Sequence, residues 1–415
     1  MNFKTIQKIF LVAMCSSVLY ACSDDDPIDE QKNDPQKEVV SISNADELFD
    51  FAQRVKNGET KLDAELVADI DLTGRLWTPI AADYHKHYEG YFKGNKHTIT
   101  GLTITEEHIK KVFDLTDEDI NYSYPLGLFS YVGDNGTITG VILKNVSIQT
   151  PNIHDVGGIA GINDGTITIC AVSGKIVGNR EVGGIAACTY NAISGCENYA
   201  DIKGNYEVGG IAGLVMKHIM SCKNYGKIEA VDNIAGGIVA MCGTKAILFN
   251  LENYGEVTVN SGAGGITGLV AGKLYNSVNY GTITGSHDIG GVVGKLDRGY
   301  YTSLEFSYDN PDDAYMENCV NYGVVQGGET TNAVIGGFYE IDPFDHKTRV
   351  TLTTKNIFYD ANVNPTLTDE RGTAIDSNTL STLNQWVDNK PAEHKNVAFK
   401  IWEKDENGKF VIKKK

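Results

Sequence analysis

The feature that most constrains the fold is a Gly-Gly doublet that recurs through the middle of the 415-residue chain. Successive doublets are 26, 26, 27, 28, 26 and 46 residues apart. Each one opens a short apolar segment, such as Val156-Gly-Gly-Ile-Ala-Gly161, without the i, i+3, i+4 apolar spacing of a helix. The last interval exceeds 26 by 20 residues, which predicts an inserted loop at 296–315. The doublets begin at Gly157, Gly183, Gly209, Gly236, Gly264, Gly290 and Gly336.

A second motif, Cys196-Glu-Asn-Tyr-Ala-Asp-Ile202 in its first copy, begins half a period after the first glycine of a doublet. Short apolar strands separated by Gly and Asn turns at this period predict an all-β fold, a β-solenoid of ~26-residue coils. Such coils stack ~4.8 Å apart through parallel strand pairing. Strand alternation then places Cys196, Asn198 and Ile202 on the inner face and Tyr199 on the outer face.

The outward charges of this motif support a stacked register. If the coils lie directly over one another, neighbouring coils contribute to common columns of side chains. Both predicted columns alternate in sign from coil to coil, as cross-strand pairs prefer. One column reads Glu197, Lys223, Glu252, and the other reads Asp201, Lys227, Glu256.

The segments on either side of the repeats, which occupy 141–345, predict end structures. Within 39–140, a capping-box-like start at 43–46 precedes a helical apolar face (Leu48, Phe51, Ala52, Val55) that ends near Gly58. This helix would protect the exposed strand edge of the first coils. Within 346–415, a short amphipathic helix at 380–387 and two strands at 399–412 predict a C-terminal cap.

The N-terminal segment, 1–38, predicts export and lipid anchoring. A basic start and an apolar stretch at 9–19, too short to span a bilayer, form a signal peptide over 1–21. It ends Leu19-Tyr-Ala-Cys22, which resembles the lipobox of bacterial lipoproteins and implies acylation of Cys22. Residues 22–38 are acidic and typical of a solvated tether, and they resemble the export signal of surface lipoproteins in Gram-negative gut anaerobes. We therefore expect a chain anchored in outer-membrane lipid through Cys22 and exposed at the cell surface.

The charge balance excludes one class of partner. The chain carries 36 Lys+Arg against 54 Asp+Glu, a formal net charge of −18. Nucleic-acid binding draws its affinity from cationic contacts to phosphate. We therefore expect no nucleic-acid partner.

The Gly-Gly-Ile-x-Gly strand with its Asn-Tyr-Gly turn resembles the GLUG repeat of bacterial surface proteins, which also occurs in IgA-specific metallopeptidases. The preceding segments Trp77-Thr-Pro-Ile80 and Gly90-Tyr-Phe-Lys-Gly-Asn95 are similar to the opening of the same lipoproteins. The resemblance covers 39 to about 345 and implies a right-handed parallel β-helix with an adhesin-like role. The zinc domain that gives the peptidase members their activity carries His-Glu-x-x-His, and this sequence has no such motif.

Two repeated columns supply the first candidate side chains. The outward tyrosines would stack, either as a flat platform for sugar rings or a partner protein, or as a purely structural ladder. They are Tyr199, Tyr225, Tyr254, Tyr280 and Tyr322. The inward cysteines Cys170, Cys196, Cys222 and Cys319 read as buried thiols, because parallel strands point successive Cβ atoms the same way and no Cys-x-x-Cys pair is present.

A third column consists of the acids two residues before the doublets, Asp155, Glu181 and Glu207. Their ~5 Å spacing is compatible with calcium or with a glycosidase pair. Nothing nearby in the sequence predicts the unequal pKa values that acid/base catalysis needs, so a solvated acidic strip is the preferred interpretation. No cofactor other than calcium is suggested.

Together these patterns predict a non-enzymatic surface lipoprotein, an adhesin or glycan-binding module on a β-helix. A polysaccharide-degrading β-helix enzyme and a purely architectural spacer remain the alternatives.

Overall fold

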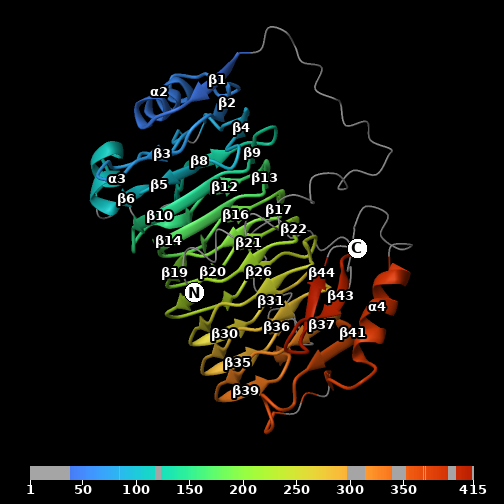
Figure 1. Ribbon diagram of the computed structural model, residues 1–415. Helices are drawn as coiled ribbons and strands as arrows, with labels where there is room; N and C mark the ends of the chain where they lie inside the picture. Colours follow the sequence, from blue (N-terminus) through green and yellow to red (C-terminus); the bar gives the residue numbers. More distant parts are fainter. Residues whose placement is uncertain are drawn as a thin grey trace.

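The structure is a computed structural model that describes residues 38–83, 85–116, 123–296, 314–338, 352–367, 369, 371–390 and 399–413. Short parallel strands stack in coils along one axis and form the predicted parallel β-helix (Figure 1). No helix within these ranges is long and apolar enough to cross a membrane. The predicted signal peptide, Cys22, most of the tether and 297–313 of the predicted insertion lie outside the described residues.

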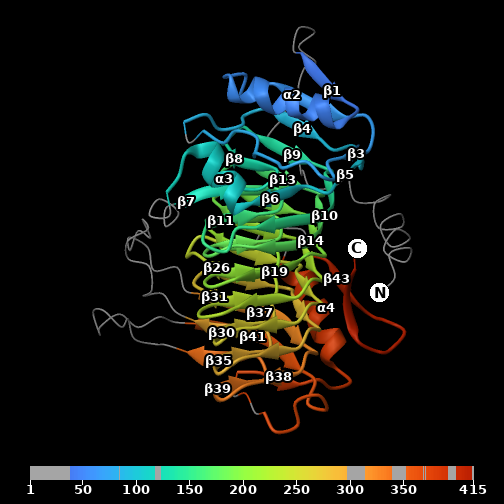
Figure 2. The same cartoon turned by 90° about the vertical axis from the view of Figure 1, so that its left-hand side faces the viewer.

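The N-terminal end is covered by a helix, as the capping pattern predicts. In α2 (Ala45–Lys56), Asn44 Oδ1 accepts a hydrogen bond from the Glu47 backbone at 3.1 Å, and Leu48, Phe51 and Val55 are buried. Figure 2 shows this helix across the end of the stack. A second helix, α3 (Glu106–Phe113), was not predicted. The other elements here are β1 (Val39–Ile42), β2 (Asp63–Leu66), β3 (Ile70–Asp71), β4 (Tyr91–Lys93), β5 (Thr98–Thr100) and β6 (Thr103–Thr105).

Two eight-stranded parallel sheets form one part of the wall, and each coil contributes one strand to each of them. The first sheet contains β7 (Ser123–Leu126), β11 (His154–Gly157), β15 (Val182–Gly183), β20 (Val208–Gly209), β25 (Ala235–Gly236), β30 (Ser261–Gly264), β35 (His287–Gly290) and β39 (Glu329–Asn332). The second contains β8 (Phe129–Val132), β12 (Ala160–Asn163), β16 (Ala186–Thr189), β21 (Ala212–Val215), β26 (Val239–Cys242), β31 (Thr267–Val270), β36 (Val293–Leu296) and β40 (Ile335–Phe338).

The remaining wall belongs to a 26-stranded sheet that also includes β1 to β6. One of its columns holds β9 (Thr137–Thr139), β13 (Thr166–Thr168), β17 (Ala192–Ser194), β22 (His218–Met220), β27 (Ile247–Phe249) and β32 (Lys273–Tyr275). The next holds β10 (Ile142–Gln149), β14 (Ala171–Val177), β18 (Glu197–Asn198), β23 (Lys223–Asn224), β28 (Glu252–Asn253) and β33 (Val278–Asn279). The third holds β19 (Asp201–Gly204), β24 (Ile228–Ala230), β29 (Val257–Thr258), β34 (Ile283–Thr284) and β38 (Val325–Gln326), and longer strands β37 (Ala314–Asn321) and β41 (Leu352–Tyr359) close the stack with β42 (Thr373–Ala374).

The register between coils follows the doublets up to Gly290 and then departs from the prediction. The first glycines from 157 to 290 pair in succession across β11, β15, β20, β25, β30 and β35. In the last coil Gly290 pairs with Asn332. Gly336 lies in the following strand, β40, directly after Ile335, the residue that pairs with Val293. Taking Gly336 as the seventh doublet was therefore wrong, and the insertion in the last coil is shorter than the final interval implied.

Close backbone approach explains the doublets. A Cβ atom on Gly183 would collide with the carbonyl oxygen of Ala186, and one on Gly184 would collide with the carbonyl oxygen of Gly210 in the next coil. Because both obstacles are backbone atoms, no side-chain rearrangement relieves them. The doublet thus marks a corner where one turn of chain crosses closely over the next.

The two predicted C-terminal elements are present, and they pack against the side of the solenoid. They are α4 (Thr379–Asn389) and the antiparallel hairpin of β43 (Ile401–Lys404) and β44 (Phe410–Lys413). Figure 1 shows all three beside β37 and β41. Trp386, Phe399 and Trp402 bury outward-facing aromatic residues of the coils, including Phe249 and Tyr275. These elements therefore cover one flank of the last coils.

Candidate binding surface

A ladder of buried asparagines fixes the backbone beneath the tyrosine column. Its members take equivalent positions in five successive coils: Asn198, Asn224, Asn253, Asn279 and Asn321. Each of the first four donates a hydrogen bond to the amide oxygen of the next asparagine at 2.8–2.9 Å. All five also donate to the backbone carbonyl two residues further along their own coil at 2.9–3.0 Å. The residue between each asparagine and the carbonyl that it binds is a tyrosine. Its side chain therefore projects outward from the same position in every coil.

The five tyrosines form one continuous stack along the solenoid. From Tyr199 to Tyr280, successive ring centroids are 4.7–4.8 Å apart with interplanar angles of 3–13°. Tyr280 and Tyr322 are 5.7 Å apart at 2°. This spacing repeats the distance between coils, so the register of the backbone determines the geometry of the stack.

The stack presents ring edges and hydroxyl groups rather than ring faces. Parallel rings could not lie side by side in one plane at 4.7 Å, so their faces must overlap. Of the alternatives for this column, a flat platform for sugar rings is not available within the stack, because each ring face is covered by the next tyrosine. A ligand approaching this flank meets a row of phenol edges.

Charged side chains two residues before the tyrosines set the state of their hydroxyl groups. Tyr199 donates to Glu197 at 2.6 Å and Tyr254 donates to Glu252 at 2.7 Å. Burial, and next the Glu197 charge, raise the pKa of Tyr199. Lys223 lies between the two acids and pairs with Glu252 at 2.9 Å, which confirms the first predicted charge column. Burial alone would lower the pKa of Lys223. The charge and the hydrogen bond of Glu252 stabilise the protonated ammonium, so the pKa of Lys223 rises.

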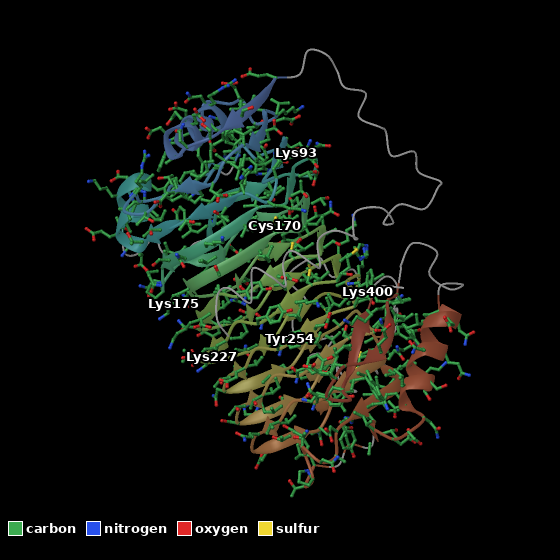
Figure 3. All side chains as sticks on the ribbon, viewed as in Figure 1. Lys93, Cys170, Lys175, Lys227, Tyr254 and Lys400 are labelled. Carbon is green, nitrogen blue, oxygen red and sulfur yellow. The ribbon has the colours of Figure 1, made fainter. Side chains whose placement is uncertain are left out.

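The C-terminal hairpin covers one end of the tyrosine row. Tyr280 donates to the carbonyl of Phe410 at 2.6 Å, and the Phe410 backbone N–H donates to the Tyr322 hydroxyl at 2.9 Å. Tyr322 is only 6% exposed, and Tyr254 is 36% exposed. Tyr280 and Tyr322, both predicted as binding residues, are thus already occupied by the chain itself. The open row, defined as Tyr199, Tyr225 and Tyr254, remains the candidate surface, and Figure 3 shows Tyr254 on this flank.

A second asparagine ladder, which the sequence analysis missed, holds the hairpin in place. Asn250, Asn276 and Asn318 adopt left-handed backbone conformations with φ of 56°, 47° and 61°. Asn276 donates to Asn250 and Asn318 donates to Asn276, both at 2.7 Å. Asn276 also donates to the Lys400 carbonyl at 2.9 Å and accepts from Trp402 Nε1 at 2.6 Å. The signal was available, because these asparagines directly precede the second motif in three successive copies.

The cysteine column contains free thiols, as predicted. The described cysteines are all free and buried, including Cys170, Cys196, Cys222 and Cys319. Burial raises the pKa of Cys196 and Cys319, the latter to about 12. The thiols of Cys196 and Cys319 are therefore neutral, and the column packs in the interior.

In the acidic column Asp155 and Glu207 are buried and Glu181 is half-buried, in contrast to the solvated strip that the sequence suggested. Asp155, Glu181 and Glu207 have left-handed φ values of 58°, 45° and 32°, and Glu207 is 1% exposed. Arg180 Nε lies 3.1 Å from both Glu181 and Glu207. The Cys188 thiol donates to Asp155 at 3.3 Å. A left-handed residue breaks the regular alternation of a strand, so the parity of the sequence could not show where these side chains point.

The burial of this column changes its chemistry. Desolvation, followed by the charges of Asp155 and Glu207, raises the pKa of Glu181 to about 8. Glu181 is therefore largely protonated at neutral pH, a difference among carboxyl groups that the sequence did not predict. Within the described residues, no group of three or more His, Cys, Asp or Glu side chains is arranged to hold a metal ion.

Comparisons with known proteins give limited similarity. No protein-family model matches the chain. Over 123 residues, 28% of this chain, the sequence is 31% identical to halomucin from Haloquadratum walsbyi, and the match spans 1% of that protein. A crystal structure described as a "putative immunoglobulin A1 protease" from Bacteroides ovatus has a TM-score of 0.47 and 18% identity, over 91% of this chain and 93% of that one. These similarities do not place the chain in a family.

Proposed function

We propose that this chain is a non-enzymatic binding module of the bacterial surface, an adhesin-like protein that contacts a glycan or a partner protein through its open row. The observation that carries the proposal is the rigid, partly exposed stack of Tyr199, Tyr225 and Tyr254. The asparagine ladder fixes all three before any ligand arrives, so binding would cost little ordering entropy. The neighbouring tyrosines already hold a protein segment, which supports a contact role for the row.

The proposed location is the outer membrane, with a lipid anchor on Cys22. The lipobox-like sequence, the acidic tether and the resemblance to GLUG-repeat lipoproteins support this placement. Incorporation of labelled palmitate into the full chain tests it. Label is expected on the native chain and is expected to disappear in Cys22→Ala; label that persists in the variant contradicts the anchor.

An enzyme is the second candidate, because Glu181 carries a raised pKa beside Glu207, a requirement for carboxylate acid/base catalysis. The burial of Glu207 speaks against it, since a catalytic carboxylate must reach its substrate. A polysaccharide-degrading activity would release new reducing or unsaturated ends when the protein is incubated with host and plant glycans. Such ends, lost in Glu181→Gln, would replace the non-enzymatic proposal.

The direct test compares two double variants on a glycan array and on epithelial cells. Tyr225→Ala/Tyr254→Ala is expected to weaken binding by about tenfold or more, because central aromatic contacts dominate most interfaces. The matched control is Tyr190→Ala/Tyr206→Ala, which removes tyrosines that are 46% and 39% exposed elsewhere. Thermal unfolding verifies that both remain folded. Equal binding by both variants contradicts the proposed surface, and no binding by the native chain favours a spacer.

A further inference from the structure

The C-terminal hairpin shows how this tyrosine row holds an extended chain. The main chain of one residue, Phe410, bridges two neighbouring coils: its C=O accepts from Tyr280 at 2.6 Å, and its N–H donates to Tyr322 at 2.9 Å. The Lys409 ammonium lies 6.0 and 5.5 Å from the same two ring centroids. The Phe410 ring meets Tyr322 edge to face at 6.2 Å. A basic residue followed by an aromatic residue thus fits two successive tyrosines.

Donors and acceptors alternate along the whole row. Tyr199 and Tyr254 donate to Glu197 and Glu252, and the second of these bonds leaves the Tyr254 oxygen to accept a hydrogen bond from a ligand. Tyr225 has Lys223 in place of the acid, and in the described part of the chain its hydroxyl makes no hydrogen bond, so its proton is available. Tyr280 is a donor and Tyr322 an acceptor towards Phe410. The open row therefore continues the alternation of donor and acceptor hydroxyl groups with which Tyr280 and Tyr322 bind the main chain of Phe410.

The distance between neighbouring tyrosine rings is also similar in the open row and in the pair that binds Phe410. The centroids of Tyr225 and Tyr254 are 4.8 Å apart, compared with 5.7 Å for the pair that Phe410 bridges. Extended peptides are commonly recognised through main-chain hydrogen bonds, with side-chain contacts adding specificity. Because the ring faces are covered by one another, hydrogen bonding at the edges is the contact that the row offers.

We propose that the open row binds an extended peptide segment of a partner protein, with a basic residue next to an aromatic one. The peptide C=O accepts from Tyr225 and the N–H of the same residue donates to Tyr254, as Phe410 does with Tyr280 and Tyr322 two coils further along. The basic residue lies beside the rings, as Lys409 lies beside Tyr280 and Tyr322, and it is attracted by the chain's net charge of −18. This assignment rests on the proposed function and names its ligand class.

The probe is a fluorescein-labelled peptide with the sequence of residues 405–413, titrated with the intact chain and followed by fluorescence anisotropy. Tyr225→Phe keeps the stack and removes the donor, so affinity is expected to fall about 3- to 10-fold. Tyr206→Phe, at a tyrosine outside the row, is the matched control and is expected to leave affinity unchanged. A peptide N-methylated at the position of Phe410 lacks the donating N–H and is expected to bind at least about tenfold more weakly.

Each outcome bears on the assignment. No binding at millimolar peptide overturns it, and so does equal binding by native chain and Tyr225→Phe, because displacement of the chain's own hairpin would not depend on Tyr225. Equal binding of the N-methylated peptide overturns the main-chain contact. Adhesion to glycans or cells that depends on Tyr225 and Tyr254, without peptide binding, overturns the peptide assignment alone. Peptide binding without adhesion contradicts the surface function instead.

Discussion

Replacing Asn253 with Ala is expected to lower the free energy of unfolding by about 4 kcal/mol or more, the largest effect of any single substitution considered. Asn253 is fully buried in the middle of the ladder and exchanges hydrogen bonds with Asn224, Asn279 and the backbone of Gly255. Its removal breaks four buried hydrogen bonds and takes the side-chain partner from both the N–H and the C=O of Gly255, and each buried group left unpaired costs ~1–3 kcal/mol. Guanidinium unfolding of both proteins measures the difference.

The matched control is Asn260→Ala, at an exposed position of the same coil. Exposed substitutions of this kind change stability by ~0.5 kcal/mol or less. If Asn253→Ala and Asn260→Ala unfold at the same guanidinium concentration, the ladder does not fix the backbone beneath the tyrosines. The rigidity that we assign to the open row would then lack its source.

The free energy of unfolding is expected to fall by about 4 kcal/mol between pH 5 and pH 8 through Glu181 alone. Burial raises the pKa of this carboxyl from 4.5 to about 8 in the folded chain. Between the two pKa values the native state binds a proton that the unfolded state has released. The stabilisation is therefore complete at low pH and is lost as the pH rises towards 8. Urea unfolding at several pH values measures the slope.

Glu181→Gln separates this contribution from those of its charged neighbours, Asp155, Glu207 and Arg180. Glutamine resembles the protonated acid, so the slope is expected to flatten and the variant to be more stable than the native chain above pH 8. Glu256→Gln, at an exposed acid, is expected to leave the slope unchanged. Equal slopes for native chain and Glu181→Gln would contradict the buried, protonated state of this carboxyl.

Much of the fold could be predicted because its constraints are local in sequence and recur at each turn. The corner at Gly183-Gly184 tolerates no side chain, so it recurs and reveals the period. Strand alternation correctly placed Cys196 and Asn198 inside and Tyr199 outside, with exposed fractions of 0% for the first two. The prediction for the last repeat was wrong, because Asn332 occupies the position of the doublet's first glycine there. The Gly-Gly pair that begins at Gly336 lies in the next strand.

The candidate surface was harder to predict because it depends on side-chain direction and on distant contacts. The alternation that placed Tyr199 outside does not apply at Glu181, whose left-handed φ turns its side chain from the expected direction. The covering of Tyr280 depends on Phe410, 130 residues away, and no repeat pattern encodes that contact. The tyrosine column itself was predicted, whereas the difference between its open and covered parts required the structure.

The most direct measurement of the central claim repeats the epithelial-cell adhesion experiment with oxidative footprinting of the adhering protein. If the open row is the contact surface, Tyr199, Tyr225 and Tyr254 become protected from hydroxyl radicals on fixed cells relative to the protein in solution. Tyr190 and Tyr206, exposed elsewhere, keep their reactivity. Protection of Tyr190 or Tyr206 with an unchanged row, or no protection at any tyrosine of the adhering protein, would contradict the claim.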